Sequence, residues 1–354
     1  MEAFRAYVPL PHGLSARVWA DRHSAGDVPD SSPYGLHRLA DHDVAVEFGE
    51  AQLGRVAGRI AASGRYRLSG AEIVEALSMR GRSTAADAIL AYDERTGIPA
   101  ALVHRREHPP VALGIGWLTT RADTPRPLAA LAARALPRAT TVWSQCAPVL
   151  DLMGPEWGVA SARKQFVPLG IDTDFYALQP QPEHPGLVVS AGEDRYRDHA
   201  LLIAAVAAAR AHTPSVHLEL ATGLPVHLPP DLGRLHTGRL DGRMRDLYRR
   251  SSVVAIALHP TVTGSGLTVV LEAMASGRPV IVTANPGIDD YLTHGEHGLL
   301  VPPGDVDAFT KAISELVADP ARCAEMGHRA ATRVRTHFSS AVMAGALASM
   351  LRSM

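Results

Sequence analysis

The chain contains few cysteines and lysines, and each shortage narrows what the protein can be. Among its 354 residues the two cysteines, Cys146 and Cys323, stand far apart and outside any C-x-x-C pair. This pattern favours a reduced, cytoplasmic protein over a disulfide-stabilised secreted one. The positive charge is almost all arginine, because Lys164 and Lys311 are the only lysines. Together with the abundant alanine and glycine, this composition is typical of a GC-rich bacterial genome.

Long apolar runs and an excess of either charge are also missing. No window approaches the ~18 uninterrupted apolar residues that read as a membrane span, and residues 1–13 lack the pattern of a signal peptide. The net charge of −1 gives no reason to expect nucleic acid as a partner. We therefore expect a protein with no membrane span, for which peripheral contact with a membrane stays open.

The length predicts two domains, because single hydrophobic cores stop growing at about 250–300 residues. In the first half, apolar runs alternate with helical patterns, which suggests a parallel sheet with crossover helices. The proline-rich segment 178–187 is the clearest interior break. Predicted strands cover 4–10, 43–48, 100–102, 111–115 and 140–144, and predicted helices cover 71–81, with Gly81 as a C-terminal cap, and 128–136.

The second half alternates more regularly. Predicted strands cover 187–192, 216–223, 253–258 and 279–283, and predicted helices cover 199–212, 244–252, 267–276 and 305–319. Asp305 is a suitable N-cap, and Asp319 with Pro320 opens the terminal helices. The expected fold is α/β, with two Rossmann-like doubly wound domains facing across a cleft. We expect the domains at 1–180 and 181–338, and a helix at 339–354 that packs back on the first domain.

Residues 259–282, HPTVTGSGLTVVLEAMASGRPVIV, place a turn of small polar residues directly before an apolar helix. A helix N-terminus offers free N–H groups and a partial positive charge. Gly264 and Gly266 would let an anion approach the backbone, as in phosphate-binding turns. The hydroxyl donors nearby are Thr263, Ser265 and Thr268. A tight turn followed by a packed helix is the open alternative.

Charged residues accompany this turn. Glu272 is the single charge of its apolar helix, so we expect it to bind ligand hydroxyls or, alternatively, to reach solvent or an arginine. Arg195 and Arg197 follow the strand that begins at residue 187. Carboxyl ends of parallel strands share one sheet edge, so one anion can touch both loops. The alternative is that the arginines pair with Glu193, Asp194 or Asp198.

The stretch GSGLTVVLEAMASGRPVIVTANPGIDDYLTHGEHGLLVPPGDVDAF resembles the C-terminal donor-binding domain of retaining glycosyltransferases of the GT-B fold, family four (glycosyltransferase group 1). The segment SAGEDRYRDHALLIAAV is similar to the first strand, basic loop and helix of that domain, and KQFVPLGIDTDFYAL to the segment that ends the N-terminal domain. The resemblance covers the chain well from about residue 140 onward and weakly before it.

The resemblance implies transfer of a sugar from a nucleotide-diphosphate sugar to an acceptor hydroxyl, with retention of anomeric configuration and without a metal or other cofactor. The acceptor, a small molecule, a glycan or a lipid, is left undefined. Arg195 and Arg197 are the implied stabilisers of the leaving diphosphate, and Glu272 matches the glutamate that usually holds the ribose. The implied donor-binding residues are Gly192, Arg195, Arg197, Thr263, Gly264, Ser265, Gly266, Leu267, Thr268 and Glu272.

The sequence also departs from the family pattern. Gly264 stands where the first glutamate of the E-x7-E pair usually contacts the donor sugar, and Asp290 only loosely matches the acid of G-G-x-x-E. Gly116 and Trp117 follow the central strand where the family often has a histidine. Spacing selects neither His104 nor His108 instead, and no catalytic base is predicted.

Two other functions stay open from the sequence. The first is a nucleotide-sugar epimerase or hydrolase of the same fold, and the second is a non-catalytic nucleotide-sugar-binding protein. A nicotinamide dehydrogenase is disfavoured, because no G-x-G-x-x-G follows a first strand.

Overall fold

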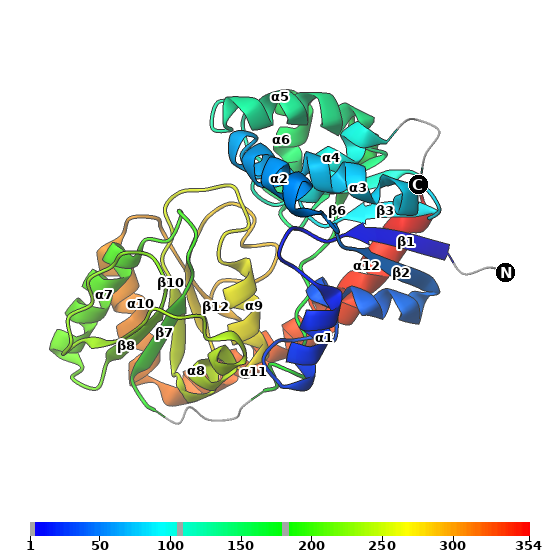
Figure 1. The fold of residues 1–354 in the computed structure, drawn as a ribbon. Helices are drawn as coiled ribbons and strands as arrows, with labels where there is room; N and C mark the ends of the chain where they lie inside the picture. Colours follow the sequence, from blue (N-terminus) through cyan, green and yellow to red (C-terminus); the bar gives the residue numbers. More distant parts are fainter. Residues whose placement is uncertain (1–3, 105–108, 179–183) are drawn as a thin grey trace. The chain divides into compact units, whose positions relative to one another are not determined.

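The computed structural model describes residues 4–104, 109–178 and 184–354, and the chain divides into two compact units. Unit 1 comprises Met1–Arg22, Ser31–Pro168 and Met343–Met354, and unit 2 comprises His23–Asp30 and Leu169–Val342. Each unit is built on one parallel sheet with helices on its faces (Figure 1). Among the described residues, no helix is long and apolar enough to cross a membrane.

The sheet of unit 1 has six strands in the order β2-β1-β3-β4-β5-β6, and every neighbouring pair is parallel. The chain passes from β1 outward to β2 and returns on the other side of β1 to β3. This reversal makes the β1/β3 position the topological switch point of a doubly wound fold. The strands are β1 (Phe4–Pro9), β2 (Val44–Gly49), β3 (Ala88–Ala91), β4 (Val111–Ile115), β5 (Thr141–Ser144) and β6 (Lys164–Phe166).

Alternating side chains bury both faces of this sheet. Ile89, Leu113 and Val142 point into a core formed with α4, α5 and α6. Their neighbours Leu90 and Trp143 point into a second core, which η1 and α12 complete. The helices of unit 1 are most of α1 (Ala16–Ser24), η1 (Pro33–His42), α2 (Arg55–Arg67), α3 (Ile73–Ser83), α4 (Glu94–Val103), α5 (Arg126–Ala135), η2 (Leu136–Arg138), α6 (Ala147–Trp157), η3 (Ser161–Arg163) and most of α12 (Ser340–Arg352).

The sheet of unit 2 has six parallel strands in the order β12-β11-β10-β7-β8-β9. The chain runs outward from β7 to β9, crosses back to β10 and runs outward to β12. The switch point of this sheet therefore lies between β7 and β10. The strands are β7 (Leu187–Ala191), β8 (His217–Ala221), β9 (Gly233–His236), β10 (Val253–Ile256), β11 (Val280–Thr283) and β12 (Gly298–Val301).

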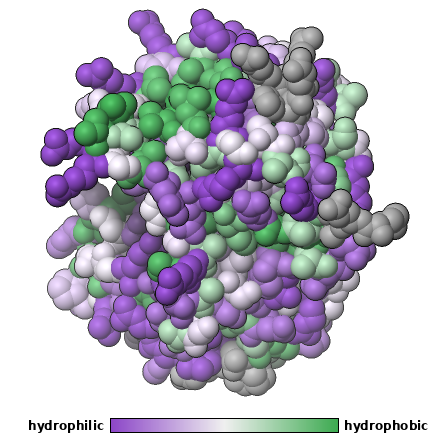
Figure 2. Space-filling view, turned by 45° about the vertical axis from the view of Figure 1, so that its right-hand side comes forward, coloured by the Kyte–Doolittle hydropathy of each residue, from purple (hydrophilic) through white to green (hydrophobic). Residues whose placement is uncertain are grey.

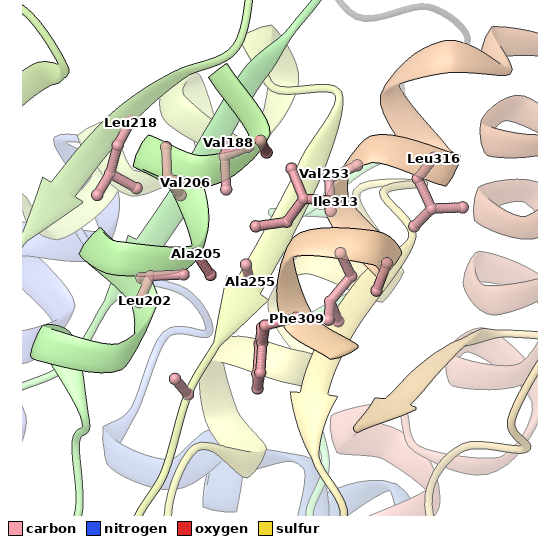
Figure 3. Close-up of a cluster of buried hydrophobic side chains, with 14 of the residues drawn as sticks. Val188, Leu202, Ala205, Val206, Leu218, Val253, Ala255, Phe309, Ile313 and Leu316 are labelled. Carbon is pink, nitrogen blue, oxygen red and sulfur yellow. The ribbon is translucent and has the colours of Figure 1, made fainter. Parts of the chain in front are cut away.

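Two layers of helices cover this second sheet, with α7 and α10 on one face and α8 and α9 on the other (Figure 1). Leu202, Phe309 and Ile313 of the first layer pack on Val188 and Ala255 of the strands (Figure 3). The helices of unit 2 are α7 (His199–His212), η4 (Asp241–Arg243), α8 (Met244–Arg250), α9 (Leu267–Ala275), α10 (Val306–Ala318) and α11 (Pro320–His337).

The elements predicted for the second half are confirmed within a few residues. Asp305 caps α10 by accepting a hydrogen bond from the Ala308 N–H at 2.8 Å, and Asp319 caps α11, which begins at Pro320. Two predictions for the first half are wrong. Residues 100–102, predicted as a strand, lie in α4, and Gly81, predicted as a cap, lies inside α3, which ends at Ser83.

The division into units falls between residues 168 and 169, whereas the sequence suggested residue 180. Hydrogen bonds explain the earlier boundary. The Leu169 N–H donates to the Tyr291 hydroxyl at 3.0 Å, and Ile171 exchanges backbone bonds with Phe338 and Ser340. The segment after 168 therefore belongs to unit 2. The predicted linker at 178–187 lies partly outside the described residues, which omit 179–183.

Helix α9 is held from behind by α11 at a position that requires glycine. A Cβ on Gly327 of α11 would overlap the carbonyl oxygen of Gly277, which ends the turn after α9 at φ 74°. The Arg278 N–H and the Gly277 N–H both return to carbonyls of α9, those of Ala273 and Met274. This close approach fixes the depth at which α9 sits against the sheet.

Replacing Gly327 by alanine should therefore destabilise the protein by about 1–3 kcal/mol through overpacking. The control is Gly81→Ala, since Gly81 also lies in a helix but a Cβ there meets nothing within 4 Å. That change should stabilise by up to about 1 kcal/mol, as expected for glycine in a helix interior. Urea unfolding of both variants measures the two effects. Equal effects of the two changes would contradict the close contact at Gly327.

Candidate functional site

The loops that leave β7 and β10 meet at the switch point of unit 2. Their backbones pair directly: the Asp198 N–H donates to Ala257 O at 2.9 Å, and the His259 N–H donates to Tyr196 O at 2.8 Å. Arg197 and Leu258 form an antiparallel bridge between these two bonds. The expectation that both loops reach one sheet edge is thus confirmed, and the pairing brings the basic loop 192–198 against the chain that leads into the glycine turn.

The glycine turn itself ends in a left-handed residue. Gly266 is the N-cap of α9 with φ 85°, a conformation that favours glycine, and it supplies no side-chain cap. The Leu267 N–H bonds to Gly264 O at 3.2 Å. Helix geometry leaves the next N–H groups, those of Thr268 and Val269, without an intrahelical acceptor. The first turn of α9, in which Thr268 is exposed, is therefore an N–H-rich end with partial positive charge.

Arg197 lies against this turn. A Cβ on Gly192 would overlap its guanidinium, and a Cβ on Gly266 would stand 3.3 Å from Nη1. The side chain is only 6% exposed, and Nη1 has no hydrogen-bond partner among the described residues. Burial lowers the pKa of Arg197, although the guanidinium stays charged at neutral pH. The loop thus holds a buried cation with one donor unused, and a buried donor without an acceptor is costly.

Asp194 orients this arginine. Its Oδ2 accepts from Arg197 Nε at 2.9 Å, and its Oδ1 accepts from the Ser265 hydroxyl at 2.9 Å and the Tyr196 N–H at 3.0 Å. The carboxylate therefore connects the basic loop to the glycine turn. The alternative that an arginine pairs with a neighbouring acid is correct for Arg197, yet the pair leaves Nη1 without a hydrogen-bond partner among residues 4–104, 109–178 and 184–354.

The remaining predicted donor residues occupy different environments. Arg195 is exposed and lies over the ring of Tyr196, whose hydroxyl accepts from Nη2 at 2.7 Å. Thr263 is buried, and its hydroxyl shares a hydrogen bond with Thr261 at 2.9 Å. Thr268 is exposed in the first turn of α9, whereas Gly264 is partly exposed in the turn before it.

Glu272 is held by two tyrosines. The Tyr176 hydroxyl donates to Oε1 at 2.8 Å, and the Tyr248 hydroxyl donates to Oε2 at 2.7 Å. Burial raises the pKa of Glu272 to about 6, and the two tyrosine bonds partly offset that rise. Both tyrosines are buried and come from distant segments, so no sequence spacing identified them. Neither solvent nor an arginine is the principal partner of this carboxylate.

Unit 1 has its own cluster of buried carboxylates near the carboxyl ends of its strands. Glu94, at the start of α4, accepts from the N–H groups of Gly116 at 3.0 Å and Trp117 at 2.8 Å. Glu72 accepts from the His12 N–H at 3.0 Å with each oxygen. Burial raises the pKa of Glu72 to about 7 and also raises that of Glu94. Nothing in the sequence pointed to either glutamate, because acids at helix starts are common and no motif surrounds these two.

Other candidates from the sequence lie apart from these clusters. His104 bonds to Ala100 O and the Ser83 hydroxyl, both at 2.8 Å, and His108 lies outside the described residues. Asp290 is exposed, and its carbonyl oxygen accepts from Arg333. Within the described ranges, no group of three or more His, Cys, Asp or Glu side chains is arranged to hold a metal ion.

The fold and the loop chemistry define a class of protein. Residues 186–319, which carry the basic loop, the glycine turn and Glu272, match the family of glycosyl transferases group 1. This part of unit 2 is therefore similar to the domain of that family. The resemblance to glycosyltransferases group 1 that the sequence indicated is confirmed over residues 186–319.

Particular relatives support this assignment. The chain is 37% identical to a D-inositol 3-phosphate glycosyltransferase of Kribbella flavida over 117 residues, which are 33% of this chain and 26% of that relative. The match thus spans about a quarter of the relative's length. Sucrose-phosphate synthase of Thermosynechococcus elongatus has the same fold, with a TM-score of 0.73 and 18% identity over 99% of this chain and 98% of that one.

HepE of Anabaena, solved in complex with UDP and glucose, is a second structural neighbour. Its TM-score is 0.70 at 17% identity, over 99% of this chain and 100% of HepE. At such identities the similarity establishes the fold alone, and both neighbours confirm the expected α/β architecture of two Rossmann-like domains.

The raised pKa of Glu272 predicts how its contribution to stability depends on pH. The folded pKa of about 6 exceeds the ordinary value of 4.5, so the carboxyl stabilises the fold below pH 4.5 and loses this contribution as pH rises through 6. Relative to Glu272→Gln, the wild type should lose up to about 2 kcal/mol between pH 4 and pH 7. Urea unfolding at several pH values measures the difference. A difference that is constant with pH, or that grows in favour of the wild type, would contradict the assignment.

Proposed function

We propose that this protein is a retaining, metal-independent glycosyltransferase that moves a sugar from a nucleotide-diphosphate sugar to an acceptor hydroxyl. The observation that carries the proposal is the buried guanidinium of Arg197, which lies beside the N-terminus of α9 and whose Nη1 has no hydrogen-bond partner in the part of the chain that the structure describes. The family match over residues 186–319 and the UDP complex of the neighbour HepE support the nucleotide sugar as donor. The two cysteines, both buried and far apart in the sequence, fit a reducing cytoplasmic setting.

The diphosphate is the group that this arrangement suits. In our proposal the distal phosphate accepts hydrogen bonds from the first-turn N–H groups of α9 and from the Ser265 hydroxyl, which in the free protein donates to Asp194. The anion then reaches Nη1 of Arg197 past Gly266. A charge-assisted bond to phosphate is stronger than a neutral one, and it satisfies the donor that the free protein leaves unused.

The chemical step follows from this placement. The bond between the anomeric carbon and the diphosphate oxygen breaks, and the electron pair stays on the diphosphate as added negative charge. Arg197 and the helix N–H groups stabilise that charge, which is the electrostatic contribution to the rate. The acceptor oxygen bonds to the anomeric carbon on the face that the diphosphate leaves, and its proton passes to the departing phosphate. Configuration is thereby retained, and the protein's cation takes the role that a metal would have.

Glu272 is proposed to bind the ribose of the donor. Each carboxylate oxygen accepts one tyrosine hydroxyl and keeps a second lone-pair site. Tyr176 and Tyr248 therefore fix the orientation of the carboxylate without using its full capacity. Two ribose hydroxyls are suitable donors for the remaining sites.

Replacing Arg197 by glutamine should lower the transfer rate by about two orders of magnitude, because the leaving diphosphate loses its buried cation. The matched control is Arg195→Gln, since Arg195 follows the same strand but is exposed and bonds to its neighbour Tyr196. That variant should stay within a few-fold of wild type. Steady-state kinetics with the donor selected from a thermal-shift panel of UDP-, GDP-, ADP- and TDP-sugars measures both. A larger loss of transfer rate for Arg195→Gln than for Arg197→Gln would show that Arg197 does not have the leaving-group role.

Glu272→Gln should weaken binding of the nucleoside diphosphate by about tenfold, as expected for loss of a charged hydrogen-bond acceptor. Binding of inorganic pyrophosphate, which has no ribose, should be unchanged in this variant. Arg197→Gln should weaken the binding of both the nucleoside diphosphate and pyrophosphate, so each variant is a control for the other. Isothermal titration calorimetry gives the four affinity changes. Equal weakening of pyrophosphate binding by Glu272→Gln would contradict the ribose assignment.

A further inference from the structure

Large hydrophobic side chains are exposed on few elements of the described chain, and α2 carries three of them. Figure 2 shows one face of the molecule, where a patch of hydrophobic residues lies among hydrophilic ones in the upper part of the view. On α2, Tyr66 is 89% exposed, Val56 is 73% exposed and Ile60 is 58% exposed. The other exposed residues of this kind are Val18, Leu77, Trp117 and Val342.

The same helix belongs to a basic, acid-free segment. Residues 51–71 contain four arginines and neither aspartate nor glutamate, in a chain whose net charge is −1. Arg65 pairs with Glu75 of α3. Arg55, Arg59 and Arg67 are exposed, and none of them forms an ion pair with a residue that the structure describes. Helix α2 thus presents three uncompensated positive charges to solvent.

The arginines and the apolar residues share one arc of α2. At 3.6 residues per turn, Tyr66 lies between Arg55 and Arg59 around the helix axis, and Arg67 lies between Val56 and Ile60. The arc is therefore neither an apolar face nor a charged face but an alternation of the two. The stem of an arginine side chain is apolar. These arginines can therefore lie beside apolar side chains that become buried and still keep their charged ends in polar surroundings.

The helix is also weakly held by the protein. Ala61 is its only fully buried residue, and two glycines, Gly58 and Gly64, lie in its interior. Each interior glycine costs about 1 kcal/mol relative to alanine. A helix with so little packing and two unfavourable residues gains stability when its exposed apolar side chains become buried elsewhere.

From this arrangement we propose that α2 is a surface that docks on a lipid bilayer with anionic headgroups. Val56, Ile60 and Tyr66 enter the boundary between headgroups and acyl chains, and Arg55, Arg59 and Arg67 bind headgroup phosphates. Tyrosine is suited to this boundary because its ring is apolar and its hydroxyl is polar. The proposal does not depend on the glycosyl transfer proposed above.

Two other occupants fit this surface less well. A second copy of the chain would bring its own arginines against these arginines, and like charges disfavour such a contact. A protein partner typically buries a centre depleted of charge within a polar rim. On α2 the arginines lie among the apolar residues, so such a centre is missing.

Sedimentation of the full chain with large vesicles tests the proposal. Vesicles of phosphatidylcholine alone should bind weakly, and vesicles of about three parts phosphatidylcholine to one part phosphatidylglycerol should bind strongly at low salt. The triple variant Arg55→Gln, Arg59→Gln, Arg67→Gln should lose about fivefold in binding for each arginine, or about two orders of magnitude in all. The matched control removes three exposed arginines elsewhere, Arg126→Gln, Arg234→Gln and Arg335→Gln.

A second variant separates insertion from simple charge attraction. Val56→Ser, Ile60→Ser, Tyr66→Ser should keep part of the binding at low salt but lose all of it at high salt, where electrostatic attraction is screened. Circular dichroism verifies that each variant is folded. Equal vesicle binding by the α2 arginine variant and its control overturns the proposal. So does a change in the oligomeric state of the lipid-free protein caused by either α2 variant, because α2 would then be a contact between copies.

Discussion

The pairing of two loop backbones at the switch point of unit 2 is the interaction on which the candidate site depends. The bridge between Arg197 and Leu258, with its flanking hydrogen bonds, joins the loop after β7 to the loop after β10. These strands are neighbours in the sheet only because the chain crosses back from β9. Without that pairing, the guanidinium of Arg197 would not lie against Gly266, and the N-terminus of α9 would have no buried cation beside it.

Asp194 has two opposing effects at the site: it orients Arg197, and its negative charge weakens the attraction of that arginine for an anion. Asp194 compensates much of the charge of Arg197, and it also holds that side chain and Ser265 in place. The unpaired Nη1 is a cost in the free protein, which an arriving anion would remove. A buried donor left unused in this way is the kind of local instability that functional sites retain while the rest of a fold is optimised. The glycines at 192 and 266 are required because side chains there would meet the guanidinium.

The sequence predicted the helices and strands around the candidate site better than those of unit 1. The glycine turn, Arg197 and Glu272 were recognisable because their neighbours in sequence are also their neighbours in the fold. Tyr176 and Tyr248 were not, since tertiary packing alone brings their hydroxyls to Glu272. Residues 100–102 were predicted as a strand but lie in a helix, because a short apolar run fits a buried helix end as well as a strand. Helix α2 was missed because its apolar residues face solvent and its glycines argue against a helix.

The central claim is that Arg197 and the N-terminus of α9 bind the diphosphate of a sugar nucleotide. A crystal structure of the protein with a bound nucleoside diphosphate tests it most directly. We expect a phosphate oxygen within hydrogen-bond distance of Nη1 of Arg197 and of the Thr268 N–H, with the Ser265 hydroxyl released from Asp194. A diphosphate bound elsewhere, with the bond from Ser265 to Asp194 intact and Nη1 still unpaired, would contradict it.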